Sequence, residues 1–245
     1  MDTSEKAVLK YLKCNGYKNV VFEPDGNVPP DFIVNSAAIE VRRLNQNYFS
    51  GSQVVGLEEI SIPLWHRIES LVQNIEVIDF DESWHVTINF MRPIGKLKEV
   101  GLTIKDQLLK FVQLPEKKSP YIIYCNNFDI ELYRASIVYE SYFICSGQDD
   151  LDAGGFTLSE MKNNIDYCIQ EKSEKIRKYK HNYEYWWLAL VDHISRGLND
   201  HDIAMLREGI RLPPDWDKLI VINPRDIGRS FELSQNDRDQ DLVEI

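Results

Sequence analysis

Two acidic residues, Asp31 and Glu40, lie in a stretch whose short apolar runs predict β-strands. Asp31 directly precedes the apolar run at residues 32–34, and Glu40 lies inside a second run at residues 38–41. The Asn35-Ser36 pair between the two runs is typical of a turn. The sequence therefore predicts two short strands joined tightly, each with a carboxylate in or beside it.

Pairing of these strands would gather charged groups at one edge of a sheet. Side chains two positions apart in a strand share a face, so Glu40 and Arg42 face one way while Val41 and Arg43 face the other. Asp31, at the entry of the first strand, can converge on Glu40. Two carboxylates with a cation beside them form a plausible site for a divalent metal ion, since hard cations prefer oxygen ligands.

These residues resemble the motif of the PD-(D/E)xK nuclease superfamily. Pro30-Asp31 matches the first half of the motif and Glu40-Val41-Arg42 the second, with eight residues between the two acids. The resemblance implies a restriction-endonuclease-like α/β fold, with a mixed central sheet flanked by helices. It also implies that Asp31 and Glu40 hold Mg²⁺ or Mn²⁺, helped by the Val41 carbonyl, for hydrolysis of phosphodiester bonds in DNA or RNA.

Pro24-Asp25 is a second candidate for the first half of the motif. Gly26 and Asn27 follow it, and this pattern favours a turn. Pro30-Asp31 is followed at once by a strand-like run, so we prefer Asp31.

The third motif position departs from the family pattern, because Arg42 replaces the usual lysine. In the resembled family that lysine positions or activates the attacking water. An arginine keeps its proton at physiological pH and cannot act as a general base, but it could clamp a phosphate or stabilise negative charge. Catalysis by a Mg²⁺-dependent nuclease and partner binding by an inactive nuclease-like domain therefore both stay open. In a third interpretation, an unrelated α/β protein, Asp31 and Glu40 are surface charges.

The predicted first helix, at residues 4–14, carries another acidic candidate. Glu5 lies on the helix side that bears Val8 and Leu12, which faces the sheet. Nuclease-like folds often place an acid from this helix near the metal, so the resemblance implies an outer-ligand or proton-accepting role for Glu5. Asp2 and Glu5 also have the spacing of a capping box, and the two interpretations have equal weight.

Strands and helices alternate along the rest of the chain, which favours a single α/β domain over residues 1–230. Strands are predicted at residues 84–91, 121–124, 141–145, 184–192 and 219–222, and the most apolar of them, 184–192, should be central. The longest helix is predicted at residues 158–180, opened by a capping box between Thr157 and Glu160.

The formal net charge of −11 argues against a protein that coats nucleic acid. Residues 231–245 carry five acids and one base, and we expect a flexible acidic tail there. A nucleic-acid substrate would need a local basic patch, for which residues 96–110 and 172–180 are candidates, although a solvated face or the helix dipole would also explain these lysines. A protein partner is equally open.

The four cysteines are scattered without CxxC spacing, as in a reduced protein. The first residues do not form a signal peptide, and no apolar run is long enough to span a membrane. We therefore expect a cytoplasmic protein that does not enter membranes.

Overall fold

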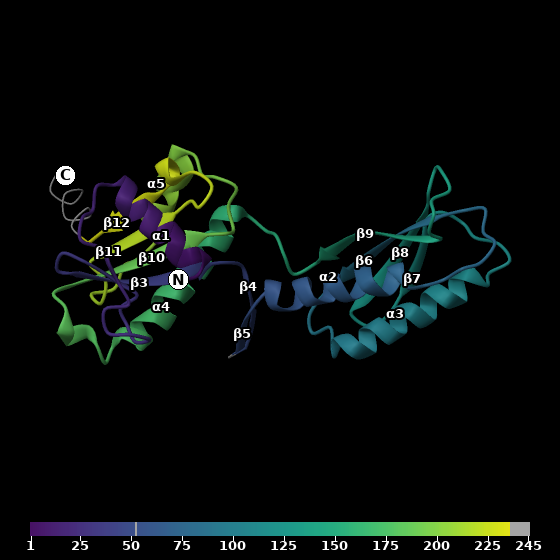
Figure 1. Cartoon of the computed structure of the whole chain (residues 1–245), viewed down its shortest axis with the longest axis horizontal. Helices are drawn as coiled ribbons and strands as arrows, with labels where there is room; N and C mark the ends of the chain where they lie inside the picture. Colours follow the sequence, from purple (N-terminus) through teal and green to yellow (C-terminus); the bar gives the residue numbers. More distant parts are fainter. Residues whose placement is uncertain (52, 236–245) are drawn as a thin grey trace. The chain divides into compact units, whose positions relative to one another are not determined.

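The structure is a computed structural model that describes residues 1–51 and 53–235 of the chain. It divides into two compact units (Figure 1). Unit 1 consists of Met1–Asn47 together with the chain from Gly155 onward, and unit 2 is Tyr48–Gly154. We had expected one domain over residues 1–230. The hydrophobic pattern of unit 2 predicts its strands and helices, but it does not show that they form a core of their own.

Unit 1 is built on a six-stranded mixed sheet, which confirms the predicted α/β class with a mixed central sheet flanked by helices. Three adjacent strands, β3, β10 and β11, run parallel, and the outer pairs are antiparallel. In spatial order the strands are β1 (Val21–Phe22), β2 (Phe32–Val34), β3 (Ala37–Leu44), β10 (Tyr185–Asp192), β11 (Lys218–Ile222) and β12 (Phe231–Ser234).

Helices cover both faces of this sheet. α1 (Thr3–Cys14) packs on one face, while α4 (Thr157–Ile176) and α5 (Asp200–Gly209) pack on the other. Two single turns of 3₁₀-helix, η1 (Lys180–Asn182) and η2 (Ile227–Arg229), complete the unit. The sheet is therefore buried on both sides, as its continuous apolar strands require.

Strand β10 is the central strand that its composition predicts. Leu188 and Leu190 pack into the core under α4, whereas Ala189 and Val191 pack into the core under α1. The strand lies between β3 and β11 in the sheet.

Several predicted boundaries are wrong, among them that of the strand predicted at residues 141–145, which runs Phe143–Asp150. Helix α4 ends at Ile176 rather than near residue 180, and its N-cap is Phe156, which makes no side-chain capping bond, rather than Thr157. Residues 231–234, assigned to the tail, form edge strand β12, because Phe231 and Leu233 alternate inward into the core. Residues 236–245 of the expected tail lie outside the described residues.

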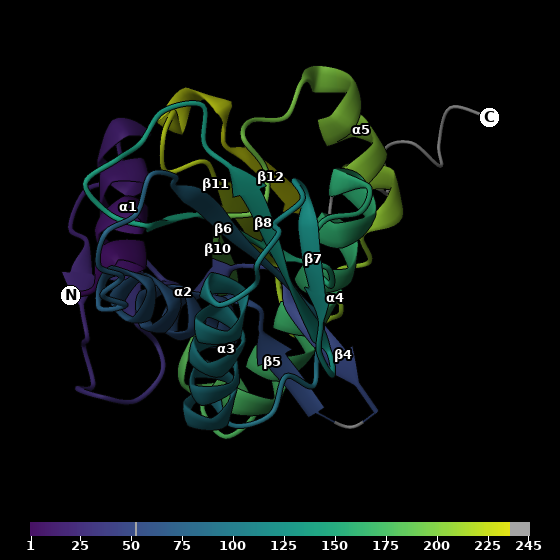
Figure 2. The same cartoon turned by 90° about the vertical axis from the view of Figure 1, so that its right-hand side faces the viewer.

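Unit 2 has its own sheet and core. A two-stranded ribbon, β4 (Asn47–Ser50) with β5 (Gln53–Gly56), leads into it. Helices α2 (Glu58–Gln73) and α3 (Leu97–Val112) pack on the same face of a four-stranded sheet (Figures 1 and 2). In order, the strands of that sheet are β7 (Tyr121–Tyr124), β8 (Phe128–Arg134), β6 (Trp84–Phe90) and β9 (Phe143–Asp150).

One buried cation links the start and the end of unit 2. The Arg92 guanidinium donates two hydrogen bonds to Asp150, of 2.6 and 2.7 Å, and one to Asp152 of 3.2 Å. It also donates to the Leu57 carbonyl oxygen at 2.8 Å. Asp150 ends β9 and Leu57 precedes α2, so the cluster ties the two ends of the unit together.

Candidate functional site

A crevice opens in unit 1 where strands β2 and β3 separate. β2 pairs with β3 only from Val34 opposite Ala37 to Phe32 opposite Ile39. β3 continues to Leu44, so its edge beyond Ile39 has no backbone partner from β2. A strand edge with unpaired backbone groups needs other partners, and here it receives them from a side chain.

Asp31 provides that partner. Its carboxylate oxygen Oδ2 accepts a hydrogen bond of 2.7 Å from the Val41 backbone N–H. The pairing of β2 with β3 ends with Phe32 opposite Ile39, and continuing that register by one residue would bring Asp31 across from Glu40 on the same face. The charge of Glu40 contributes to raising the pKa of Asp31, so the two carboxylates lie close enough to interact.

The crevice continues as a hollow of about 330 Å³. Asp2–Glu5 at the start of α1, Asp31, Val41–Arg43 of β3 and Lys172 of α4 line it. Because the N–H and C=O of one residue in a strand point to the same edge, the Val41 carbonyl also faces this side. Acidic, basic and backbone groups thus meet in one hollow.

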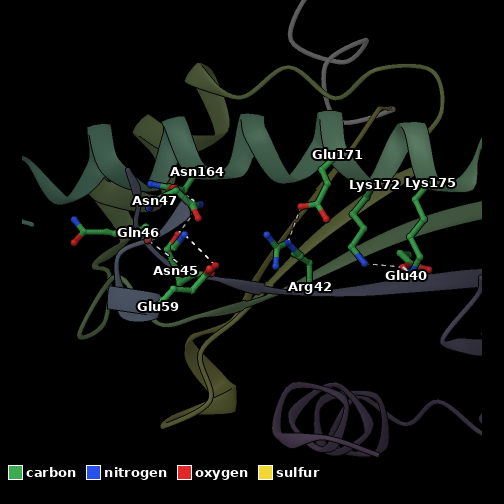
Figure 3. Close-up of polar contacts among 11 residues, drawn as sticks. Glu40, Arg42, Asn45, Gln46, Asn47, Glu59, Asn164, Glu171, Lys172 and Lys175 are labelled. Atoms are coloured by element: carbon green, nitrogen blue, oxygen red, sulfur yellow. Dashed lines mark hydrogen bonds and ion pairs between the residues drawn. The ribbon is translucent and has the colours of Figure 1, made fainter. Parts of the chain in front are cut away.

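Glu40 is completely buried, and α4 supplies its counter-charges (Figure 3). Its oxygen Oε1 accepts a hydrogen bond of 2.7 Å from the Lys172 ammonium. The Lys175 ammonium donates to the same oxygen. A buried carboxylate is expensive unless it is paired, and the two lysines from α4 meet that requirement.

The second Glu40 oxygen, Oε2, is buried and has no hydrogen-bond partner among the described residues. Burial, followed by the charge of Glu40, raises the pKa of Asp31. The Val41 N–H and the charges of Lys172 and Lys175 oppose that shift without cancelling it. Asp31, which lines the hollow, is therefore short of positive charge, and the buried Glu40 Oε2 lacks a hydrogen-bond partner among the described residues.

Arg42 is held away from Glu40 by a different partner. Its Nε lies 2.9 Å from the Glu171 carboxylate of α4, as Figure 3 shows. Arg42 shares the α4 face of β3 with Glu40, as the strand alternation predicts, and its side chain lines the hollow. The guanidinium is anchored at one nitrogen beside the carboxylates.

Glu5 forms the capping box that its spacing from Asp2 predicts. The Asp2 side chain accepts from the Glu5 backbone N–H at 2.8 Å, and the Glu5 carboxylate accepts from the Asp2 backbone N–H. Glu5 also lines the hollow with Asp31. Its carboxylate is thus committed to the helix end, although its position leaves the outer-ligand hypothesis open.

Lys172 and Lys175 are the residues of the site that the sequence pattern did not assign to it. A signal was present, because Lys172 falls on the apolar stripe of α4 where a charged side chain is out of place. The other buried residues of that stripe are Met161, Asn164, Ile165, Cys168, Ile169 and Ile176. A buried lysine needs a buried acid, and Glu40 is the acid with which Lys172 pairs.

The residues fit a Mg²⁺ or Mn²⁺ ion held by few protein ligands. Within residues 1–51 and 53–235 no three His, Cys, Asp or Glu side chains form a metal-binding group. Mg²⁺ often takes only one or two carboxylates and keeps several waters, which matches Asp31 and Glu40 with the Val41 carbonyl. The unpartnered Glu40 Oε2 is the observation that favours such an ion.

The charge of the chain is unevenly divided. Residues 48–154 contain 16 acids and 9 bases, and residues 236–245 contain four acids and one base. The remaining residues of unit 1 contain 19 acids and 18 bases. Most of the net negative charge therefore lies outside the part of unit 1 that bears the hollow.

No protein-family model matches the sequence, and neither a curated protein nor a solved structure does so. Within the described part of the chain, no helix combines the length and apolarity that crossing a membrane requires. The geometry of the hollow is therefore the basis for the functional proposal that follows.

Proposed function

We propose that the chain is a metal-dependent nuclease of the PD-(D/E)xK type, which hydrolyses phosphodiester bonds in DNA or RNA. The observation that carries the proposal is that Asp31 accepts from the Val41 N–H where the pairing of β2 with β3 ends, while Glu40 of β3 pairs with the buried Lys172. Asp31, the Glu40 Oε2 oxygen and the Val41 carbonyl would hold Mg²⁺ or Mn²⁺. When bound, that ion lowers the pKa of its water and neutralises phosphate charge.

Lys172 takes the role that Arg42 cannot perform. It lines the hollow, donates to Glu40 and is buried, so its ammonium is fixed beside the carboxylates. From there it orients the attacking water and stabilises the negative charge that develops on the phosphate. In the resembled motif the lysine follows Glu40 by two residues. Here the equivalent ammonium comes from helix α4.

Arg42 holds the phosphate in this scheme. Its Nε is bound to Glu171, which leaves the planar end of the guanidinium as the part that can contact a phosphate oxygen. Because unit 1 without residues 236–245 is close to neutral, a few cations around the hollow suffice to attract a polyanion locally.

A second candidate function keeps the same fold but involves no phosphodiester hydrolysis. Two ammonium groups already pair with Glu40, and the Asp31 carboxylate accepts a hydrogen bond from the Val41 N–H. The cluster is therefore stable as a structural element. This observation favours an inactive nuclease-like domain that binds a protein or nucleic acid. The two functions differ in whether a divalent ion binds.

Mg²⁺- or Mn²⁺-dependent cleavage of single- and double-stranded DNA and RNA by the full chain tests the proposal. The parent protein should cleave at least one of these substrates, and Glu40→Gln should not. Glu99→Gln is the matched control, because Glu99 lies on α3 with an exposed carboxylate. Equal cleavage by parent and Glu40→Gln contradicts the metal site. Ion binding without cleavage of any substrate favours the inactive domain.

The cysteines bear on where such an enzyme works. All four are free thiols in the structure, and Cys168 is buried next to the site. Free thiols suit a reducing compartment, and we propose the cytoplasm.

A further inference from the structure

We propose that Lys175 is a placeholder cation, which neutralises Glu40 in the metal-free protein and leaves it when a divalent ion binds. The released ammonium then contacts a phosphate of the substrate. This inference rests on the proposed metal site and adds a role for a residue outside the motif.

The charges of the cluster require such an exchange. Asp31 and Glu40 together carry two negative charges, and Lys172 with Lys175 carries two positive ones. A divalent ion on Glu40 Oε2 would lie on the same carboxylate as two ammonium groups. Unit charges of the same sign about 4 Å apart repel by several kcal/mol at the effective dielectric constant of a protein surface. At least one ammonium must therefore withdraw.

Lys175 is the lysine that is able to leave. Its side chain is 44% exposed, against 9% for that of Lys172. Withdrawal of Lys172 would bury an unpaired ammonium among the apolar residues of α4, which is costly. Withdrawal of Lys175 exchanges one ion pair for hydration at the open end of the helix, so it costs little.

The released group stays close to the site. Lys172 and Lys175 are three residues apart on α4, so their side chains lie on the same helix face, as Figure 3 shows. The flexible lysine chain keeps the ammonium within reach of Glu40, and under the proposed function phosphate oxygens of the substrate would gather around the ion bound there. Ion binding thus changes Lys175 from a partner of Glu40 into a contact for substrate.

Amine labelling of the full chain tests the exchange without any catalytic readout. Acetylation by an N-hydroxysuccinimide ester, quantified by peptide mass spectrometry, is compared with and without Mn²⁺. Lys178 is the control, since it is an exposed lysine just beyond the end of α4. We expect Mn²⁺ to raise the labelling rate of Lys175 severalfold and to leave that of Lys178 within twofold. An unchanged Lys175 rate at saturating Mn²⁺ overturns the inference.

Calorimetric titration with Mn²⁺ provides a second test. Lys175→Met should bind the ion about tenfold more tightly than the parent, because no ammonium has to be displaced. Lys178→Met makes the same change in net charge and should alter the affinity less than twofold. Equal or weaker binding by Lys175→Met overturns the inference, and the labelling of the parent chain decides the question if that variant does not fold.

Glu40→Gln separates failure of the inference from failure of the proposed function. If Glu40→Gln alone loses the ion while Lys175→Met matches the parent, the metal site stands and the placeholder role is wrong. If neither the parent nor Lys175→Met binds Mn²⁺, or if Glu40→Gln binds it as the parent does, both are wrong. Binding by Lys175→Met but not by the parent supports the placeholder role most strongly.

Discussion

Each unit of the chain contains a buried cluster of ionic side chains, and these two clusters are built in opposite ways. In unit 2, the cation Arg92 is shared by two carboxylates and a carbonyl, with several N–H groups directed at separate oxygens. In unit 1, the carboxylate of Glu40 receives two ammonium groups on one oxygen and none on the other. The first arrangement distributes its hydrogen bonds, whereas the second concentrates them.

Under the proposed function, the difference separates a structural cluster from one that binds an ion. Bidentate pairing of a guanidinium with a carboxylate is directional and strong, and the Arg92 cluster connects the two ends of its unit. Each cluster leaves one buried atom without a hydrogen-bond partner among the described residues, Glu40 Oε2 and Arg92 Nε, and of these only the carboxylate oxygen can accept a metal ion. Under the proposed function, Glu40 Oε2 is the oxygen that binds the ion, whereas the Arg92 cluster serves only stabilisation.

The largest effect should come from Lys172, if the unit 1 cluster is catalytic. Replacing Lys172 by Gln should slow metal-dependent cleavage about 10²–10³-fold, because a fixed charge that stabilises the transition state is lost. Lys162→Gln is the matched control, since Lys162 lies on the same helix and pairs with Asp166. Single-turnover rates provide the measurement, and equal losses in both variants would show that α4 is merely destabilised.

The second largest effect should come from the Arg92 cluster of unit 2. Arg92→Met should lower the free energy of unfolding by about 3–5 kcal/mol, because it leaves two carboxylates and a carbonyl without their buried partner. Denaturant titration measures this loss. The Mn²⁺ affinity of the folded fraction should not change, since the ion binds in unit 1. A loss of ion binding in this variant would break the assignment of one role to each cluster.

Arg42 should have a smaller effect than Lys172. Arg42→Ala should weaken substrate binding about tenfold through loss of a phosphate contact, with little change in the rate at saturating substrate. Arg42→Lys should recover part of that binding, without exceeding the parent in rate, because Lys172 already supplies an ammonium. A rise in rate for Arg42→Lys would restore the motif position as the site of the catalytic lysine.

The smallest effect concerns pH. Burial and the charge of Glu40 raise the pKa of Asp31 from its ordinary 3.8, so the folded state holds its proton more tightly than the unfolded state. The free energy of unfolding therefore falls as the pH rises from the Asp31 pKa of the unfolded state to that of the folded state. The lost stability is not regained at neutral pH. Without metal, Asp31→Asn should therefore melt a few degrees higher than the parent at about pH 7, with the difference shrinking toward about pH 4. Melting curves across that range, with a chelator present, would contradict the account if the difference grew toward acid pH.

Local signals in the sequence were sufficient for the strands and the motif. The turn at Asn35-Ser36 and the apolar runs around it predict β2 and β3, and the strand parity of Glu40 and Arg42 is confirmed. The Asp2–Glu5 capping box is also local, and it is confirmed. Each of these features depends on residues close together in the chain.

Long-range contacts could not be predicted in the same way. Lys172 meets Glu40 across 132 positions, and the sequence shows only that both are charged residues in apolar surroundings. Unit 2 was missed as a separate body because its strands and helices have ordinary patterns, and only their packing shows that they form a core of their own. The boundary of β12 was missed because acidic neighbours obscured the alternation of Phe231 and Leu233.

The central claim is that Asp31 and Glu40 share one divalent ion. A crystal of the full chain soaked in Mn²⁺ tests it directly, because anomalous scattering locates the ion. We predict one Mn²⁺ within about 2.0–2.4 Å of an Asp31 oxygen and of Glu40 Oε2, with Lys175 turned away from Glu40. A fully soaked crystal with no anomalous peak between the two carboxylates, and both lysines still bound to Glu40, would contradict the account.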